Sequence, residues 1–309
     1  MRSSSTTFSL LVLTFLLSCQ VCSALRAPAD TVRLWEGYDV SSGKETVLYT
    51  FHQENPNGTA VIICPGGSYF WHDVKGEGLE VADFLLSQGF TPFVLLYRVP
   101  GFGAFFTHEL AHFRGKTHPA MISDAQRALQ WVREHSGEYG IDPDRVGMMG
   151  FSAGGHLVMS AACYSSTDFL KANGIETVTD LRPSFVVPVY PVVTLYGPYA
   201  HRRSRRGLLG EYRRYSKTMR DSLSLQDHIP ADCPPVFLTN CVDDPVVDYH
   251  NSVLLDSALT ASGVNHIYHQ YKAGKHGYGV SEIYGTPECR VWKYEFLEWI
   301  KTIFKNEEH

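Results

Sequence analysis

Short apolar runs alternate with segments of helical periodicity along most of this 309-residue chain. Runs rich in β-branched and aromatic residues, which are typical of buried strands, occupy residues 60–64, 93–97, 146–149, 185–190, 236–239 and 266–271. Helical spacing of apolar residues marks residues 79–87, 121–135, 153–162, 252–261 and 291–304. This alternation predicts an α/β fold, with a mostly parallel, doubly wound sheet and helices on both of its faces.

Composition narrows the classes of protein that fit. The chain is 44% hydrophobic and 19% charged, which excludes a disordered protein. Its formal net charge of −5 gives no electrostatic reason to expect a nucleic-acid partner. We find no internal repeat and no linker, so we expect one domain over residues 25–309.

The amino terminus is typical of a secretory signal peptide. Arg2 precedes an apolar run over residues 8–17, and Cys22 and Ala24 stand at the −3 and −1 positions of a cleavage site. We therefore predict that residues 1–24 are removed and that the protein is secreted. An uncleaved membrane anchor is the alternative, because residues 8–25 carry no charged side chain. No second stretch is long and apolar enough to span a bilayer, so stable membrane insertion is not expected.

Secretion affects how the cysteines are interpreted. Five remain after the signal peptide: Cys64, Cys163, Cys233, Cys241 and Cys289. This odd number allows one or two disulfides with a leftover thiol, and the sequence does not reveal the pairing. No Cys-x-x-Cys pair exists among these five cysteines, which argues against a structural zinc site. Asn57-Gly58-Thr59 is a glycosylation sequon in a turn-like setting.

A nucleophile motif stands between a predicted strand and a predicted helix. Residues 150–154 read Gly-Phe-Ser-Ala-Gly, directly after the strand at 146–149 and at the start of the helix at 153–162. A strand–turn–helix of this kind exposes the serine hydroxyl above the sheet, and the small flanking residues let the turn close. We expect Ser152 to be the nucleophile of an acyl-transfer reaction.

A serine nucleophile needs a base and an orienting acid, which follow it along the chain in this class of fold. His276 lies in a glycine-flanked loop after the strand at 266–271. Three carboxylates, those of Asp243, Asp244 and Asp248, lie after the strand at 236–239. Both loops leave the carboxyl ends of strands, where Ser152 also lies. The residues alone leave the choice among the three aspartates open.

The oxyanion formed during acyl transfer needs two backbone N–H donors. Ala153 is one candidate, because it opens the helix after the nucleophile. Gly67 and Ser68, in the turn after the strand at 60–64, are candidates for the other donor.

Together these motifs resemble the α/β-hydrolase superfamily, and within it secreted esterases similar to acetylxylan-esterase-like and feruloyl-esterase-like (BD-FAE-like) enzymes. The matching stretches are CPGGSY (64–69), GEGLEVADFL (76–85), LLYRVP (95–100), HPAMISDAQRALQWVREH (118–135), YGIDPDRVGMMGFSAGGHL (139–157), YPVVTL (190–195), LLGE (208–211), DDPVVDYHNS (243–252) and GKHGYG (274–279). The resemblance implies the α/β-hydrolase fold with small insertions over the active site and a Ser–Asp–His triad without a cofactor. It also implies ester substrates, often acetyl groups on carbohydrate.

The resemblance also favours one aspartate. The group carries a pattern similar to D-x-x-V-P-x-x-N-S, and Asp244 fits its first position, with Asn251 and Ser252 in step. Asp248 replaces the proline of that pattern, which is a departure from it. A second departure is an insertion over residues 101–117.

That insertion contains a competing metal motif. His108, Glu109, His112 and His118 fit H-E-x-x-H-x-x-G-x-x-H, which resembles the metzincin metallopeptidase signature. A helix would place His108 and His112 on one face, His118 would complete a zinc site, and Glu109 would activate water. His118 already belongs to the hydrolase-like stretch, so we favour no metal and read the insertion as an aromatic flap built from Phe102, Phe105, Phe106 and Phe113.

Residues 195–230 interrupt the alternation with a basic cluster: His201, Arg202, Arg203, Arg205, Arg206, Arg213 and Arg214. We interpret it as a solvated surface loop or cap over the site. A binding site for anionic partners and a cleavage site for basic-specific proteases are the alternatives.

Three functions from different classes remain after these observations. The first is a secreted serine esterase acting on a small-molecule or carbohydrate ester. The second is a peptidase, either a serine enzyme on the same fold or a zinc enzyme. The third is a non-catalytic binding protein, against which the complete set of Ser152, Asp244 and His276 argues.

Overall fold

The computed structural model describes residues 25–43 and 45–305, so the predicted signal peptide lies outside the described residues. Its strands are β1 (Asp30–Arg33), β2 (Val47–Thr50), β3 (Gly58–Cys64), β4 (Thr91–Leu96), β5 (Ile141–Phe151), β6 (Val186–Val189), β7 (Val236–Cys241) and β8 (His266–Tyr271). They form one eight-stranded sheet with the order β1-β2-β4-β3-β5-β6-β7-β8. The six strands from β3 to β8 are parallel to one another, which confirms the predicted sheet.

The two remaining strands, β1 and β2, form an antiparallel extension at one edge of the sheet. The sequence analysis did not predict them. Each has four residues, and β1 is mostly exposed, so neither has the continuous apolar run of a buried parallel strand. Their pairing depends on the edge of β4, which is a long-range contact.

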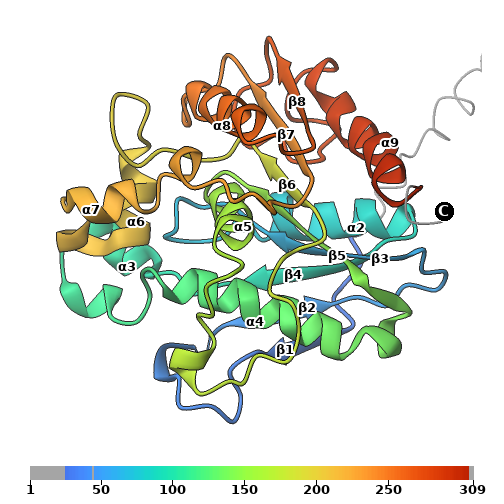
Figure 1. Ribbon diagram of the computed structural model, residues 1–309, viewed down its shortest axis with the longest axis horizontal. Helices are drawn as coiled ribbons and strands as arrows, with labels where there is room; N and C mark the ends of the chain where they lie inside the picture. The colour runs from blue at the N-terminus through green and yellow to red at the C-terminus, as the bar shows by residue number, and fades with distance from the viewer. Residues whose placement is uncertain (1–24, 44, 306–309) are drawn as a thin grey trace, which may run out of the picture.

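Helices cover both faces of the sheet (Figure 1). They are α2 (Glu80–Ser87), α3 (Gly101–Phe106), α4 (Ala120–Glu134), α5 (Ala153–Cys163), α6 (Arg202–Arg213), α7 (Lys217–Asp221), α8 (His250–Ala261) and α9 (Trp292–Lys305). Buried side chains of α4, α5 and α8 belong to one apolar cluster, and those of α2 and α9 belong to another. None of the helices in the described part of the chain combines the length and apolar character that crossing a membrane requires.

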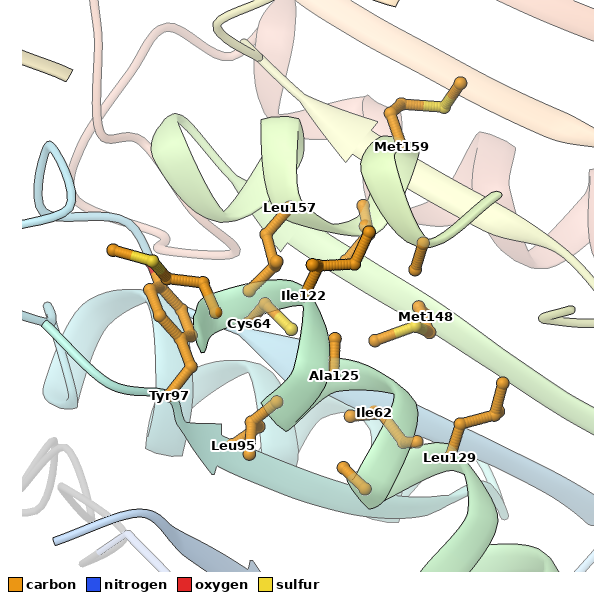
Figure 2. Packing of buried hydrophobic residues seen from close by; sticks show 14 of the residues in the cluster. Ile62, Cys64, Leu95, Tyr97, Ile122, Ala125, Leu129, Met148, Leu157 and Met159 are labelled. Atoms are coloured by element: carbon orange, nitrogen blue, oxygen red, sulfur yellow. The ribbon is translucent and has the colours of Figure 1, made fainter. Parts of the chain in front are cut away.

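The two apolar clusters lie on opposite faces of the sheet because successive strand residues point in opposite directions. In β3, Ile62 belongs to the cluster under α4 and α5, whereas Val61 and Ile63 belong to the cluster under α2 and α9. Figure 2 shows the first cluster at close range, with Ile62, Leu95 and Met148 of three neighbouring strands beside Ile122, Ala125 and Leu129 of α4. Burial on both faces holds the carboxyl ends of the central strands at one rigid edge.

The segments that interrupt the strand–helix alternation lie together at that edge. In Figure 1, α3 of the 101–117 insertion lies beside α6 of the 195–230 segment. The guanidinium of Arg206 joins them by donating hydrogen bonds to the carbonyls of Ala104, Phe105 and Thr107. Residues 195–230 therefore form a partly helical cap, in which Leu208 and Leu209 are buried.

Candidate active site

Ser152 occupies the sharp turn between β5 and α5. Its backbone has φ 54° and ψ −114°, a conformation that side chains other than glycine rarely adopt. The turn closes because Gly154 lets the helix start approach β3: a Cβ on Gly154 would lie 1.9 Å from the carbonyl oxygen of Cys64. The serine is consequently held at the carboxyl edge of the sheet, as the nucleophile motif predicts.

His276 reaches Ser152 from the loop after β8. Its Nε2 lies 3.0 Å from the Ser152 Oγ, and its Nδ1 lies 2.6 Å from the Oδ2 of Asp244. Since a carboxylate only accepts hydrogen bonds, Nδ1 carries the proton and Nε2 accepts one from the serine hydroxyl. Three side chains from distant parts of the chain thus form one hydrogen-bonded series.

The three candidate aspartates have different partners. Asp244 is almost fully buried, and its second oxygen accepts hydrogen bonds from the backbone N–H groups of Val246 and Val247. Asp243 accepts hydrogen bonds from the backbone of residues 274 and 275, and Asp248 pairs with His250. Only Asp244 of the three contacts the imidazole of His276.

The candidate oxyanion donors surround the serine. Gly67 and Ser68 follow β3, which pairs with β5, and both have positive φ values of 140° and 56°. Within residues 25–43 and 45–305, no acceptor takes a hydrogen bond from the backbone N–H of Gly67, Ser68 or Ala153. All three donors are therefore free for a substrate oxygen. Helix α6 covers this turn, because a Cβ on Gly207 would lie 2.5 Å from the carbonyl oxygen of Ser68.

A buried carboxylate that the sequence analysis did not single out lies beneath this turn. Glu77 accepts hydrogen bonds from the backbone N–H of Gly66 at 2.7 Å and from the Tyr190 hydroxyl at 2.8 Å. The Tyr190 hydroxyl also accepts one from the backbone N–H of Gly279, and its ring lies 4.6 Å from that of His276. Burial raises the pKa of the Glu77 carboxyl above its usual value. The nearby His276 and the hydrogen bonds from Tyr190 and Gly66 oppose this shift but do not cancel it. Glu77 thus links the oxyanion turn to the histidine loop.

Only a weak signal in the sequence marks Glu77. It is an acidic residue between two glycines just before an apolar helix. Acidic residues near helix starts are common on protein surfaces. Its burial follows from β3, α2 and Tyr190 meeting in the folded chain, which local sequence does not reveal.

Aromatic side chains pack against one another beside the oxyanion turn. The ring of Trp71 stacks on that of Phe102 with centroids 5.0 Å apart, and Phe70 contacts Phe105 and Phe113. Phe102 is 61% exposed. The aromatic flap expected from the 101–117 insertion is therefore present next to the site.

The same insertion does not form the helix that the zinc alternative requires. Helix α3 ends at Phe106, and the guanidinium of Arg206 donates hydrogen bonds to the carbonyl groups of its last turn. Residues 110–113 form a separate 3-10 turn. His108 pairs with Glu211, His112 with Glu109, and the His118 ring packs against Phe169. In the described part of the chain, no group of three or more His, Cys, Asp or Glu side chains is placed to hold a metal ion. His108 and His112 therefore do not lie on the single helix that the zinc alternative requires.

The predicted glycosylation site lies apart from Ser152. Asn57 precedes β3 and is exposed, at the end of that strand opposite the oxyanion turn. All five cysteines of the described chain are free thiols.

At the edge of the site, His201 precedes α6 and is half-buried. Burial lowers its pKa to about 4, so its imidazole is neutral near neutral pH.

Comparison with known proteins assigns this chain to a family. A model of the family described as BD-FAE matches residues 48–259. An acetylxylan esterase of Xylanibacter ruminicola is 28% identical, over 78% of this chain and 45% of that protein. Endo-1,4-beta-xylanase B of Butyrivibrio fibrisolvens is 29% identical, over 79% of this chain and 36% of that protein. The chain spans less than half the length of these two curated relatives.

Solved structures agree with the family match. The acetyl ester-xyloside bifunctional hydrolase of Caldicellulosiruptor lactoaceticus superposes with a TM-score of 0.75 at 29% identity, covering 91% of this chain and 98% of that one. The carboxylesterase Cest-2923 of Lactobacillus plantarum has a TM-score of 0.66 at 19% identity, over 83% and 92% of the two chains, and so shares the fold. This chain belongs to the BD-FAE family and has the α/β-hydrolase fold, and several of its named relatives are carboxylic ester hydrolases.

Proposed function

We propose that this chain is a serine hydrolase that cleaves carboxylic esters through an acyl-enzyme. The single observation that carries the proposal is the hydrogen-bonded series Asp244–His276–Ser152 at the carboxyl edge of the sheet. The names of its relatives support ester substrates.

Each side chain of the series has a role in the proposed reaction. His276 removes the proton from Ser152 as the serine oxygen attacks the acyl carbon, and returns that proton to the leaving alcohol. Asp244 fixes the tautomer of His276 and stabilises the imidazolium. In the second half, His276 takes a proton from water, and the hydroxide attacks the acyl-enzyme and frees Ser152 and the carboxylic acid. The N–H groups of Ala153 and of Gly67 or Ser68 stabilise the negative oxygen in both halves.

The proposed substrate is a short acyl ester, such as an acetyl group on a carbohydrate. Two relatives are named for xylan or xyloside substrates, and another is named an acetylxylan esterase. The exposed rings of Phe102 and Phe106 offer apolar contact area to a substrate, and ligand sites are usually lined by apolar and aromatic side chains.

The decisive experiment compares Ser152→Ala with Ser166→Ala, an exposed serine outside the site. With a small acetyl ester, Ser152→Ala should lose on the order of 10⁶-fold in kcat if the three residues act as one unit, and Ser166→Ala should keep full activity. A panel of acetylated sugars, feruloyl esters, nitrophenyl esters and peptides then identifies the preferred acyl group and alcohol. Unchanged ester turnover by Ser152→Ala contradicts the proposal.

Three other outcomes favour the alternative functions. Hydrolysis of peptides in preference to esters favours a serine peptidase. Activity that is lost on treatment with a chelator but kept in Ser152→Ala favours a metal-dependent enzyme. No turnover of any substrate by the folded wild type favours a binding protein.

The proposal includes secretion and a glycan on Asn57. The composition of residues 1–24 supports export, and the exposed Asn57 lies about 20 Å of strand away from the oxyanion turn. When the full chain is expressed in eukaryotic cells, the culture medium should contain a protein that begins at residue 25. A glycosidase should lower its mass, and Asn57→Gln should abolish that change. Retention in the cells with Met1 intact contradicts secretion.

A further inference from the structure

Cys241 and Cys289 bring their sulfur atoms together behind the site. Cys241 ends β7, and Cys289 starts the 3-10 turn Cys289–Val291 that leads into α9. A Cβ placed on Gly274 would lie 2.5 Å from one Sγ and 2.6 Å from the other, so the two sulfurs are within about 5 Å of each other. Both residues are fully buried.

We propose that Cys241 and Cys289 form a disulfide when the chain folds in an oxidising compartment. Because the two sulfurs are at most about 5 Å apart, they need to approach each other by roughly 3 Å to reach the length of a disulfide bond, about 2 Å. Nothing in this inference depends on the reaction proposed for Ser152.

A low-molecular-weight disulfide, such as oxidised glutathione, is the oxidant. While the chain is still folding and both thiols are accessible, one of the two thiolates attacks it to form a mixed disulfide and releases one small thiol. The other thiolate then attacks the protein sulfur of this mixed disulfide and releases the second small thiol. Overall the two protein thiols lose two electrons and two protons, and the S–S bond of the oxidant becomes two thiols.

Once the chain around the two sulfurs has folded, Cys289 is the one of the five described cysteines whose thiol pKa is lowered. A hydrogen bond from the Cys241 thiol and another from the backbone N–H of Thr286 lower the pKa of the Cys289 thiol. Burial instead raises the thiol pKa of Cys64, Cys163 and Cys233. A lower pKa increases the fraction of reactive thiolate.

The disulfide would close a segment that carries two of the three side chains of the site. Asp244 and His276 both lie between residues 241 and 289. Gly274, which lies next to both sulfurs, is two residues before His276. Its backbone N–H donates a hydrogen bond to the carboxylate of Asp243. The covalent link therefore fixes the start of α9 to the end of β7 at the base of the histidine loop, and it stabilises the fold by restricting the unfolded chain.

The test maps the cysteines of the full-length chain. The protein is folded in a mixture of reduced and oxidised glutathione, denatured in N-ethylmaleimide, digested and analysed by mass spectrometry. We expect a linked pair of peptides that contain Cys241 and Cys289, and N-ethylmaleimide on the half-buried control Cys233. N-ethylmaleimide on both Cys241 and Cys289, or a bond from either to a third cysteine, overturns the proposal.

A second measurement uses stability, so that it is independent of esterase activity. The oxidised wild type should melt roughly 5–10 °C above the reduced wild type. Cys233→Ser should keep this difference, and the double variant Cys241→Ser, Cys289→Ser should lose it. A redox-dependent melting temperature in the folded double variant contradicts the proposal. If the double variant does not fold, the peptide map of the wild type still decides.

Discussion

Asp243 and Asp244 are neighbours in sequence, yet their carboxylates hold different parts of one loop. Asp244 binds the imidazole of His276 at 2.6 Å, whereas Asp243 binds the backbone N–H groups of Gly274 and Lys275, each at 2.8 Å. The two adjacent acids therefore orient the histidine ring and position the backbone that precedes it.

An alanine series separates the three aspartates. Asp244→Ala should lower kcat by about 10⁴-fold, because His276 loses the group that sets its tautomer. Asp243→Ala should lower kcat by roughly 10- to 100-fold, since a loosened loop misplaces the imidazole. Asp248→Ala should stay within about twofold, because its side chain pairs only with His250.

Steady-state kinetics on one nitrophenyl ester measures all three variants. The melting temperature of each variant serves as the control for folding. An Asp248→Ala enzyme as impaired as Asp244→Ala would mean that the acid has been assigned to the wrong residue.

Glu77 provides a prediction about the oxyanion turn. Its carboxylate accepts hydrogen bonds from the Tyr190 hydroxyl and from the backbone N–H of Gly66. Gly66 directly precedes the candidate donors Gly67 and Ser68. Glu77→Gln keeps the volume but replaces one acceptor oxygen with a donor group. We expect kcat to fall by about 10- to 100-fold with KM almost unchanged, because the displaced turn acts on the negative oxygen of the transition state.

The matched control for this variant is Glu80→Gln. Glu80 lies one turn later in α2 and is half-buried, and it should keep kcat within about twofold. A rise in KM at constant kcat in Glu77→Gln would show that the turn binds the substrate's ground state instead.

The sequence predicts the parts of this molecule that depend on local pattern. Buried parallel strands are short apolar runs, and the serine, aspartate and histidine each follow the carboxyl end of one, so their common edge follows from topology. Glu77 and the strands β1 and β2 depend on contacts between distant segments, and their own sequences carry little signal. The choice of Asp244 over Asp243 came from resemblance, because both follow the same strand and only the folded loop distinguishes them.

The histidine-rich insertion shows how a specific pattern can mislead. The spacing of His108 and His112 fits a helix face, but the carbonyls that would continue α3 are taken by Arg206 from the cap. A side chain about 100 residues away thus determines where that helix ends, and the sequence around His108 does not reveal it.

Arg206 leads to a prediction about the flap. Its guanidinium holds α3 through three carbonyl groups, pairs with Glu211, and lies over the ring of Phe70. Arg206→Met should free the aromatic flap while leaving the three hydrogen-bonded side chains in place. We expect KM for a bulky ester to rise by about 10-fold, with kcat within about threefold.

Arg202→Met is the control, since Arg202 is exposed on the same helix. Kinetics on a bulky ester and on a small acetyl ester distinguish flap contact from a general loss of structure. A matching loss of kcat on both esters would assign Arg206 to the fold as a whole rather than to the flap.

His156 connects three parts of the molecule through a neutral ring. Its Nδ1 accepts a hydrogen bond from the Tyr69 hydroxyl at 2.8 Å, and its Nε2 donates one to the carbonyl of Leu223 at 3.0 Å. Burial lowers its pKa from 6.5 to about 4, while the hydrogen bond to Leu223 opposes that shift. Protonation of Nδ1 would remove the acceptor for Tyr69, next to the oxyanion turn.

The lowered pKa makes stability depend on pH in a defined direction. Between pH 6.5 and about pH 4 the unfolded chain binds a proton at His156 that the folded chain does not, so the free energy of unfolding decreases as the pH falls through this window. The full shift corresponds to about 3 kcal/mol. His156→Gln, which can still pair with Tyr69 and Leu223, should reduce the pH dependence by up to that amount in urea titrations, whereas His52→Gln at an exposed site should not. Equal slopes for wild type and His156→Gln would mean that His156 titrates alike in the folded and unfolded chains.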